Sequence, residues 1–428
     1  MLLLLSSLVV FLVVGVPIAY SLGLSGMVYF MIEQPELLAI LPQRVFAGMD
    51  TYAMVALPLF VLMGLVMNAG GMTTRLIDFS LIFVGRFRGG LGLVNVFASM
   101  VFGGISGSSV SDTASIGAIL IPEMKKKGYR ADFSAGITVA SSTMGMIIPP
   151  SVPMVVYALA AEQSVGRLFL GSLLPGLAIG VFMLGITFLL STIYKYPKEE
   201  LSLSPKEVWN RLKRGFLAVI MPVFVIGSVV LGIATATESA AIGVLYAMVV
   251  GFFIIKGLKL KEIPGLLKSS AMTSATVMII IALSKLYIWI LALERVPMQV
   301  AAFLSGMEVP TFVLILMINL VILLTGTFVD VTPAILLLTP VFLPAVVALG
   351  MSPITFGVLL ISGLAVGLVT PPVGMCLNVG SAISKLPIGT IFRAALPFLL
   401  ANLITLLLIS FAEPFTLWLP ALLMNGAG

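Results

Sequence analysis

Histidine is absent from the 428-residue chain, cysteine occurs once, and acidic and basic side chains together make up only 9% of it. Without histidine, a histidine-based proton relay or metal site is excluded. The single Cys376 leaves no partner for an intrachain disulfide. The 23 basic residues outnumber the 17 acidic ones, but they fall mostly in short loops, so nucleic acid is not expected as a partner.

Apolar residues make up 60% of the chain, and apolar runs of about 20 residues, the length of a membrane-spanning helix, recur from end to end. The lipid bilayer is therefore the expected environment, and the fold class is an all-α polytopic membrane protein. The opening MLLLLSSLVVFLVVGVPIAYSLG lacks a basic n-region and a small-residue cleavage site, so it predicts a first span and not a signal peptide.

Basic side chains predict the topology, because short cytoplasmic loops are enriched in Lys and Arg. Nineteen of the 23 fall in five segments that we expect on the cytoplasmic side: 75–88, 125–130, 195–214, 256–268 and 385–393. Both termini then lie outside.

The segment between Arg88 and Lys125 starts and ends on the cytoplasmic side, so GGISGSSVSDTASIGAILIP predicts a re-entrant hairpin that turns near Ser106–Ser109. A pair of short helices with a glycine-rich packing face is the alternative.

An internal repeat supports the hairpin. GSSVSDT from Gly107 matches GTFVDVT from Gly326, and GMIIPPS from Gly145 matches GLVTPPV from Gly367, in the same order. The segment after the first hairpin, EMKKKGYRAD, is basic, whereas its counterpart PAVVALGMSP carries no charge. The two halves are therefore expected in opposite orientations, as in the inverted repeats of secondary transporters.

Each half is expected to contain scaffold helices, an amphipathic interfacial arm helix and a set of transport elements. The predicted boundaries are 1–72 for the first scaffold, 73–90 for its arm, 91–193 for the first transport elements (hairpin 91–122, broken helix 133–164), 194–215 for a cytoplasmic linker, 216–293 for the second scaffold, 294–308 for its arm, and 309–428 for the second transport elements (hairpin 311–345, broken helix 352–384).

The paired prolines Pro149–Pro150 and Pro371–Pro372 predict that each broken helix unwinds near mid-membrane, because proline lacks an amide donor and disfavours helix in the residue before it. Unwinding frees carbonyl oxygens, which together with hairpin hydroxyls and one carboxylate form the kind of oxygen cage that suits Na⁺. The two predicted sets are Ser106, Ser108, Asp112, Gly145, Ile148 and Pro150, and Gly326, Thr327, Asp330, Gly367, Thr370 and Pro372.

Other polar residues have competing interpretations. Asp112 could instead be a helix N-cap, since SSVSDTASIGAILIP also resembles a helix start. Glu238 fits a coupling residue or a structural hydrogen bond, and Lys285 fits snorkelling or pairing with an acid. No arginine lies in the apolar parts of the hairpins or after either proline pair, so helix N-termini and polar side chains are the expected anion ligands. The candidate substrate contacts are Ser109, Ser151, Asn378 and Ser381.

GGISGSSVSDTASIGAILIPEMKKKGY, GITVASSTMGMIIPPSVPMVVYA, TATESAAIGVLYA and GLVTPPVGMCLNV resemble the large membrane subunit of the tripartite ATP-independent periplasmic (TRAP) transporters over nearly the whole chain. The resemblance implies an elevator-type, sodium-driven importer in a bacterial or archaeal inner membrane. It implies C4-dicarboxylates, sialic acid or other sugar acids as substrates. A soluble periplasmic binding protein and a four-helix membrane subunit would be partners, the latter as a separate chain because this sequence ends after its last span.

The family motif carries the sodium-site role onto both predicted sets, except for Thr327, which is assigned from the repeat alone. In the gap-free alignment Asp112 matches Val331, so the two carboxylates are offset by one position.

Three other classes remain open. A stand-alone sodium-coupled dicarboxylate or citrate symporter would share the hairpins without needing a soluble partner. An intramembrane aspartyl enzyme would need Asp112 and Asp330 close enough to share a proton, and a channel would not require two opposed hairpins. The inverted repeat with its two opposed hairpins favours a transporter over these classes, so the chain is expected to be a transporter and not an enzyme.

Overall fold

The computed structural model describes residues 2–50, 52–198, 204–307 and 309–424, and this part of the chain is helical with no β-strand beyond one isolated bridge between Arg88 and Lys198. Seven of its helices are long and apolar enough to cross a membrane, or nine if two bent pairs each count as one span. The expected all-α polytopic membrane protein is confirmed.

The helices of the first half run from the N-terminus to a 29-residue span. They are α1 (Leu2–Val13), α2 (Ile18–Glu33), α3 (Leu41–Met49), α4 (Ala56–Ala69), α5 (Met72–Val84), α6 (Gly90–Ser106), α7 (Ser109–Lys126), α8 (Ala131–Ser141), α9 (Met144–Ile147), α10 (Val152–Ala160) and α11 (Val165–Ile193).

The second half repeats this order with fewer breaks. Its helices are α12 (Pro205–Val230), α13 (Ala236–Val249), α14 (Ile263–Leu293), α15 (Val296–Gly306), α16 (Thr311–Phe328), α17 (Val331–Ala348), α18 (Pro353–Gly367), α19 (Met375–Ser384), α20 (Ile388–Phe411) and α21 (Pro414–Met424). A helical hairpin (α6–α7 or α16–α17) is followed in both halves by a proline-broken helix and a long span.

Several predicted boundaries differ from the structure. The apolar run over residues 22–42 predicts a single span, but the structure interrupts it at Gln34, which adopts an extended φ of −145° before Pro35. The apolar run over residues 397–420 likewise predicts one closing span, but these residues are divided between α20 and α21, and Pro414 begins the second of these helices. α12 begins at Pro205, inside the segment expected to be a linker, because Ser204 caps its N-terminus and Pro205 takes the first helical position.

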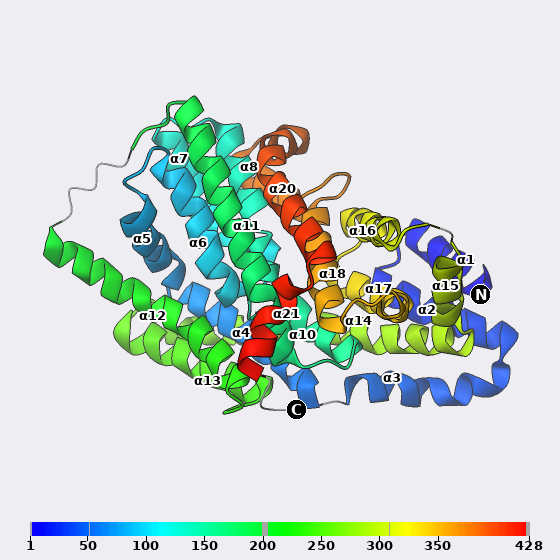
Figure 1. Ribbon diagram of the computed structural model, residues 1–428. Helices are drawn as coiled ribbons and strands as arrows, with labels where there is room; N and C mark the ends of the chain where they lie inside the picture. The colour runs from blue at the N-terminus through cyan, green and yellow to red at the C-terminus, as the bar shows by residue number, and fades with distance from the viewer. Residues whose placement is uncertain (1, 51, 199–203, 308, 425–428) are drawn as a thin grey trace.

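The hairpins, the broken helices and helices α11, α20 and α21 occupy the middle of the molecule, and the remaining helices lie on two sides of them (Figure 1). On one side α1, α2, α3 and α14 share an apolar core of their own, which includes Leu22, Phe30 and Tyr287. On the other side α5, α12 and α13 lie together, and α4 joins them to the centre. This arrangement places long scaffold helices against the tips of both hairpins.

Candidate functional site

The tips of the two hairpins open onto one cavity of about 300 Å³. Each tip is a two-residue break between helices, formed by Gly107 and Ser108 in the first hairpin and by Val329 and Asp330 in the second. Helices α4 and α14, both in segments predicted as scaffold, close the cavity from the other side. Its polar lining residues are Ser106, Ser108, Ser111, Thr273, Asp330 and Thr332. Elements from both halves and from the scaffold therefore meet at one site.

Asp112 is fully buried in the first turn of α7. Its Oδ1 accepts a hydrogen bond from the Ser106 hydroxyl, whereas its Oδ2 has no hydrogen-bond partner in the described structure. An isolated carboxylate oxygen inside apolar protein is costly unless a partner compensates it. The geometry therefore leaves one coordination position on this carboxylate open.

The N-cap interpretation of Asp112 is wrong. Ser108 is the N-cap of α7, and its side chain accepts from the backbone amide of Ser111 at 3.5 Å. Asp112 lies four residues further along the helix. Its burial therefore has to be explained by something other than capping.

The unwound part of the first broken helix packs directly on the hairpin tip. Gly145 lies so close to Oδ2 of Asp112 that an added Cβ would overlap the carboxylate. The carbonyl oxygen of Pro149 lies 2.8 Å from the ideal Cβ position of Gly104. The carbonyl oxygen of Pro150 lies 3.3 Å from the ideal Cβ position of Gly107. Gly107 has φ +60°, a conformation that glycine adopts without strain. The structure thus brings Ser106, Ser108, Asp112, Gly145 and Pro150 together.

Ile148 has extended backbone at the end of α9, with ψ 123°, and it is buried. Its side chain packs against Gly176 of α11, 2.5 Å from that glycine's ideal Cβ position. The side chain is therefore used in packing. The backbone carbonyl, which lies outside regular helix, is the part of Ile148 that can serve as an ion ligand.

The second half forms a smaller cavity of about 30 Å³, room for roughly one water molecule or small ion. Gly326, Thr327 and Asp330 line it together with Leu368 and residues 373–375 of the unwound segment. Gly326 and Gly367 touch backbone to backbone, since a Cβ on either would overlap the other. Of the predicted second set, Gly367, Thr370 and Pro372 are neighbours of this cavity and not part of its lining.

The two threonines of the second set already use their hydroxyl protons. Thr327 Oγ1 donates to the carbonyl of Leu324 and Thr370 Oγ1 to that of Val366, each at 2.8 Å. Their oxygens can still accept or coordinate. Pro372 is exposed, so its side chain closes nothing at this site.

The two carboxylates are not equivalent. Asp330 is the N-cap of α17, its Oδ1 accepts from the amide of Val331 at 2.7 Å, and it is exposed. When the hairpin tips are matched by structure, Asp330 corresponds to Ser108 and not to Ser111, its partner in the gap-free alignment. The offset arises because α16 continues two residues beyond Gly326, whereas α6 ends at Ser106 before the left-handed Gly107.

The four candidate substrate contacts fall into two groups. Ser109 and Ser151 are buried beside the tip and their hydroxyls have no hydrogen-bond partner in the described structure. Asn378 and Ser381 instead bond local carbonyls, the first to Val373 at 2.7 Å and the second to Leu386 at 2.6 Å. None of the four belongs to the lining of the shared cavity.

Three polar lining residues were not predicted from the sequence, namely Ser111, Thr273 and Thr332. Thr332 occupies the repeat position of Thr113, so the repeat alignment contained a signal for it. Thr273 lies in helix α14, and nothing in its local sequence distinguishes it.

Glu238 forms a capping box with Thr235, which supports its structural interpretation. Lys285 makes no ion pair within the described residues, and its side-chain stem packs on Gly48.

Nothing in the site resembles paired catalytic acids. Within residues 2–50, 52–198, 204–307 and 309–424, Asp112 and Asp330 share no hydrogen bond, and no three His, Cys, Asp or Glu side chains gather in a way that could hold a metal. Two hairpin tips and two proline-broken helices that come together around a small cavity resemble the discontinuous-helix sites of secondary transporters.

Comparison with known proteins agrees with this class. Residues 5–415 match the family model of the tripartite ATP-independent periplasmic transporter, DctM component. The chain is 35% identical over 94% of its length to the C4-dicarboxylate TRAP transporter large permease protein of Pseudomonas aeruginosa, covering 93% of that protein. It is 35% identical to the sialic acid TRAP transporter large permease protein of Vibrio cholerae, over 96% of both chains.

A third relative differs in length. The chain is 34% identical over 98% of its length to the isethionate TRAP transporter permease protein DctMQ of Oleidesulfovibrio alaskensis, but covers only 65% of it. Among solved structures, the Alcanivorax borkumensis YdaH transporter superposes with a TM-score of 0.64 at 15% identity, covering 89% of each chain, which supports the fold alone. The chain belongs to the DctM family, the large membrane component of TRAP transporters.

Proposed function

We propose that this chain is the permease subunit of a sodium-coupled, binding-protein-dependent importer of a small organic acid. The observation that carries the proposal is the cavity shared by both hairpin tips and by scaffold helices α4 and α14. A ligand in this cavity would contact both hairpins and the scaffold helices. If the hairpins moved relative to the scaffold, the ligand would become accessible from the other side of the membrane.

The chemistry of the cavity fits a small anion. Helices α7 and α17 both begin at its edge, and helix N-termini carry partial positive charge that favours anions. Serine and threonine hydroxyls supply further donors, and the lining contains no lysine or arginine. The relatives named for C4-dicarboxylate, sialic acid and isethionate all point to an acidic substrate, and the same class is proposed here.

The charges at the hairpin tips support the proposed sodium coupling. An anion in the cavity would meet the carboxylate of Asp330 and would contact Ser111, the neighbour of the buried Asp112, and like charges repel each other. A Na⁺ ion held at each tip would remove this repulsion. The open Oδ2 of Asp112 and the 30 Å³ cavity beside Asp330 are the proposed positions, with the two sets of residues predicted above as ligands. Substrate and Na⁺ would then stabilise each other's binding.

An elevator movement is proposed for the transport step. The hairpins and broken helices (91–193 and 309–428) would move as one body against the scaffold (1–72 and 216–293), carrying the cavity across the membrane. Support comes from the composition of the cavity wall, in which 12 of the 17 lining residues belong to the moving set and five belong to the fixed set. The arm helices α5 and α15 would link the two bodies.

The proposed setting is a bacterial or archaeal inner membrane with both termini outside. The proposed partners are a soluble periplasmic binding protein and a small four-helix membrane subunit. The relative that this chain covers to only 65% shows that a permease can be longer than the large component alone, and here the small subunit is proposed to be a separate polypeptide.

Reconstituted uptake tests the function directly. Proteoliposomes that contain both membrane subunits are given an inward Na⁺ gradient, a candidate radiolabelled acid and the cognate binding protein. Uptake should require both the gradient and the binding protein. Uptake without any soluble protein would reassign the chain as a stand-alone symporter, and uptake that is unaffected by collapsing the Na⁺ gradient would refute the coupling.

A further inference from the structure

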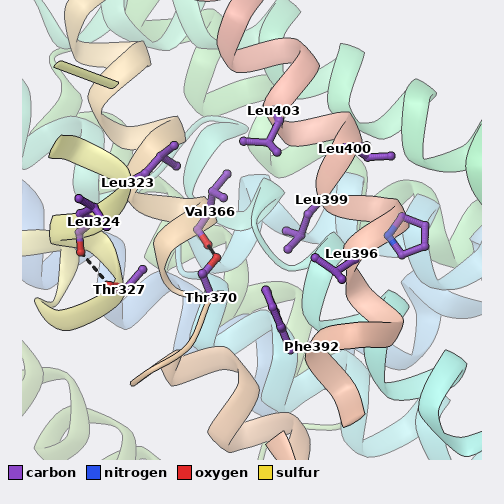
Figure 2. A pocket seen from close by; sticks show the side chains of 11 residues that line it. Leu323, Leu324, Thr327, Val366, Thr370, Phe392, Leu396, Leu399, Leu400 and Leu403 are labelled. Atoms are coloured by element: carbon purple, nitrogen blue, oxygen red, sulfur yellow. Dashed lines mark hydrogen bonds between the residues drawn. The ribbon is translucent and has the colours of Figure 1, made fainter. Parts of the chain in front are cut away.

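An apolar groove of about 580 Å³ runs along α20 between this helix, α16 and α18 (Figure 2). It is separate from the cavity at the hairpin tips, and the two have no lining residue in common. Three of its leucines are about half exposed at the surface of the chain, Leu324 at 53%, Leu396 at 47% and Leu400 at 55%. The groove is therefore open on the side that faces away from the protein core.

The two polar residues of this groove do not make it polar. Thr327 and Thr370 direct their hydroxyl protons back to backbone carbonyls three or four residues earlier in the chain, as the dashed lines in Figure 2 show. Their methyl groups and the surrounding leucines, valine, proline and phenylalanine form the wall. Such a surface favours a hydrocarbon chain and offers nothing to a polar substrate.

A basic cavity of about 350 Å³ adjoins the groove at Pro397, which lines both. Arg130, Asp132, Tyr194, Thr390 and Arg393 contribute its polar groups. Arg130 is held by Asp132 in two hydrogen bonds of 3.1 and 2.6 Å, whereas Arg393 is exposed and makes no ion pair in the described part of the chain. Two arginines against one aspartate leave one net positive charge.

We propose that the groove and the basic cavity together form a binding site for one anionic phospholipid, with the phosphodiester at Arg393 and an acyl chain along α20. The occupant is identified by the pairing of features. A single phosphodiester charge balances the single excess cation, and an acyl chain fits an apolar groove on a helix that is long and apolar enough to cross a membrane.

The position of the site suggests a consequence for the second hairpin. A lipid chain in the groove would press on Thr327 and Thr370, which flank the second proposed ion position. Its binding does not depend on sodium coupling, so it can be measured without transport.

The test is lipid retention by the full-length chain in detergent, followed by native mass spectrometry during titration with phosphatidylglycerol or with phosphatidylethanolamine of the same acyl chains. Wild-type protein should retain phosphatidylglycerol preferentially. Arg393→Gln should lower its affinity about fivefold, the effect of one basic residue near an anionic lipid surface. The control Arg88→Gln removes an exposed arginine that lines neither cavity, and it should leave affinity unchanged.

The apolar half has its own pair of variants. Leu400→Trp should fill the groove and weaken both lipids, whereas Ile404→Trp, on the same helix at 47% exposure but outside the groove, should not. Thermal unfolding of each variant shows whether it is folded.

Four outcomes would overturn the site. These are equal retention of the two lipids by wild-type protein, equal effects of the two arginine variants, displacement of the lipid by glycerol 3-phosphate as effectively as by phosphatidylglycerol, and loss of retention when the small membrane subunit binds. The third outcome would indicate a soluble phosphate site, and the fourth would show that a partner covers the groove.

Discussion

The hydroxyl of Ser106, the last residue of α6, donates a hydrogen bond to Oδ1 of Asp112 in the first turn of α7. This contact joins the two arms of the first hairpin across its tip and fixes the orientation of the carboxylate. Oδ2 then faces Gly145 of the broken helix and has no partner. The hydrogen bond between Ser106 and Asp112 therefore leaves Oδ2 oriented toward any ligand that binds between the hairpin and the broken helix.

Removing the charge of Asp112 should weaken sodium dependence. In Asp112→Asn the amide cannot neutralise a cation, so the Na⁺ concentration for half-maximal uptake should rise about 10-fold to 100-fold, as expected for losing an interaction of about 1.5 to 3 kcal/mol with a charged group. The measurement is initial uptake in proteoliposomes over a range of external Na⁺.

The matched control for this experiment is Glu123→Gln, which removes a half-exposed carboxylate from the other end of α7. It should leave the sodium dependence as in wild type. An Asp112→Asn variant with unaltered sodium dependence would eliminate Asp112 as an ion ligand, and a parallel shift in both variants would indicate a general electrostatic effect.

Close packing at Gly145 should make this glycine irreplaceable. In Gly145→Ala the new methyl would overlap the Asp112 carboxylate and lie 3.2 Å from the carbonyl carbon of Ser108. Overpacking of this kind costs about 1 to 3 kcal/mol. We therefore expect a lower unfolding temperature together with loss of sodium-stimulated uptake.

Gly185→Ala provides the comparison, because Gly185 lies in α11 and no atom comes within 4 Å of its ideal Cβ position. Alanine there should be neutral or slightly stabilising, since it is the better helix former. If Gly145→Ala behaved like Gly185→Ala in both measurements, the tight contact between the broken helix and the hairpin would be refuted.

The sequence predicted those parts of the molecule that depend on local chemistry. Both hairpin tips follow from small residues in otherwise apolar runs, and both unwound segments follow from proline pairs, since proline interrupts a helix in any surroundings. The charged linker and the closing span were predicted less well. Ser204 and Pro205 start α12 within the expected linker, and Pro414 divides the C-terminal span.

The details of the site depend on tertiary packing and could not be predicted in the same way. Thr273 reaches the cavity only because α14 packs beside the hairpins. The role of Asp330 depends on where α16 ends, and that end is set by the absence of a left-handed glycine like Gly107. For this reason the two carboxylates, offset by one position in the alignment, are offset by four positions in the structure.

The opposite orientation of the two halves predicts opposite labelling at two hairpin ends. Lys126 ends α7 and Gly350 follows α17, and both are exposed. In a Cys376→Ser background, Lys126→Cys should react with a membrane-impermeant maleimide only from the cytoplasmic side, and Gly350→Cys only from outside. Intact and permeabilised spheroplasts distinguish the two. Reaction of both cysteines from one common side would contradict the inverted repeat.

The elevator makes a prediction about Thr273 and Thr332, which line the same cavity from α14 and α17. Because one belongs to the proposed scaffold and the other to the moving hairpin, a covalent link between them should hold the hairpin in one position. We expect the double variant Thr273→Cys, Thr332→Cys, in the Cys376→Ser background, to lose nearly all uptake on cross-linking and to regain it on reduction.

The accompanying control is a link within one body. Thr355 and Thr416 hydrogen-bond to each other at 2.7 Å, and both helices that carry them, α18 and α21, belong to the proposed moving part. A cross-link between cysteines at these positions should leave uptake intact, because it joins elements that travel together. Docking of the loaded binding protein should survive in both cross-linked samples. Full uptake in a completely cross-linked Thr273–Thr332 sample would rule out the elevator, whereas equal inhibition by the two links would mean that the assignment of α18 and α21 to one body is wrong.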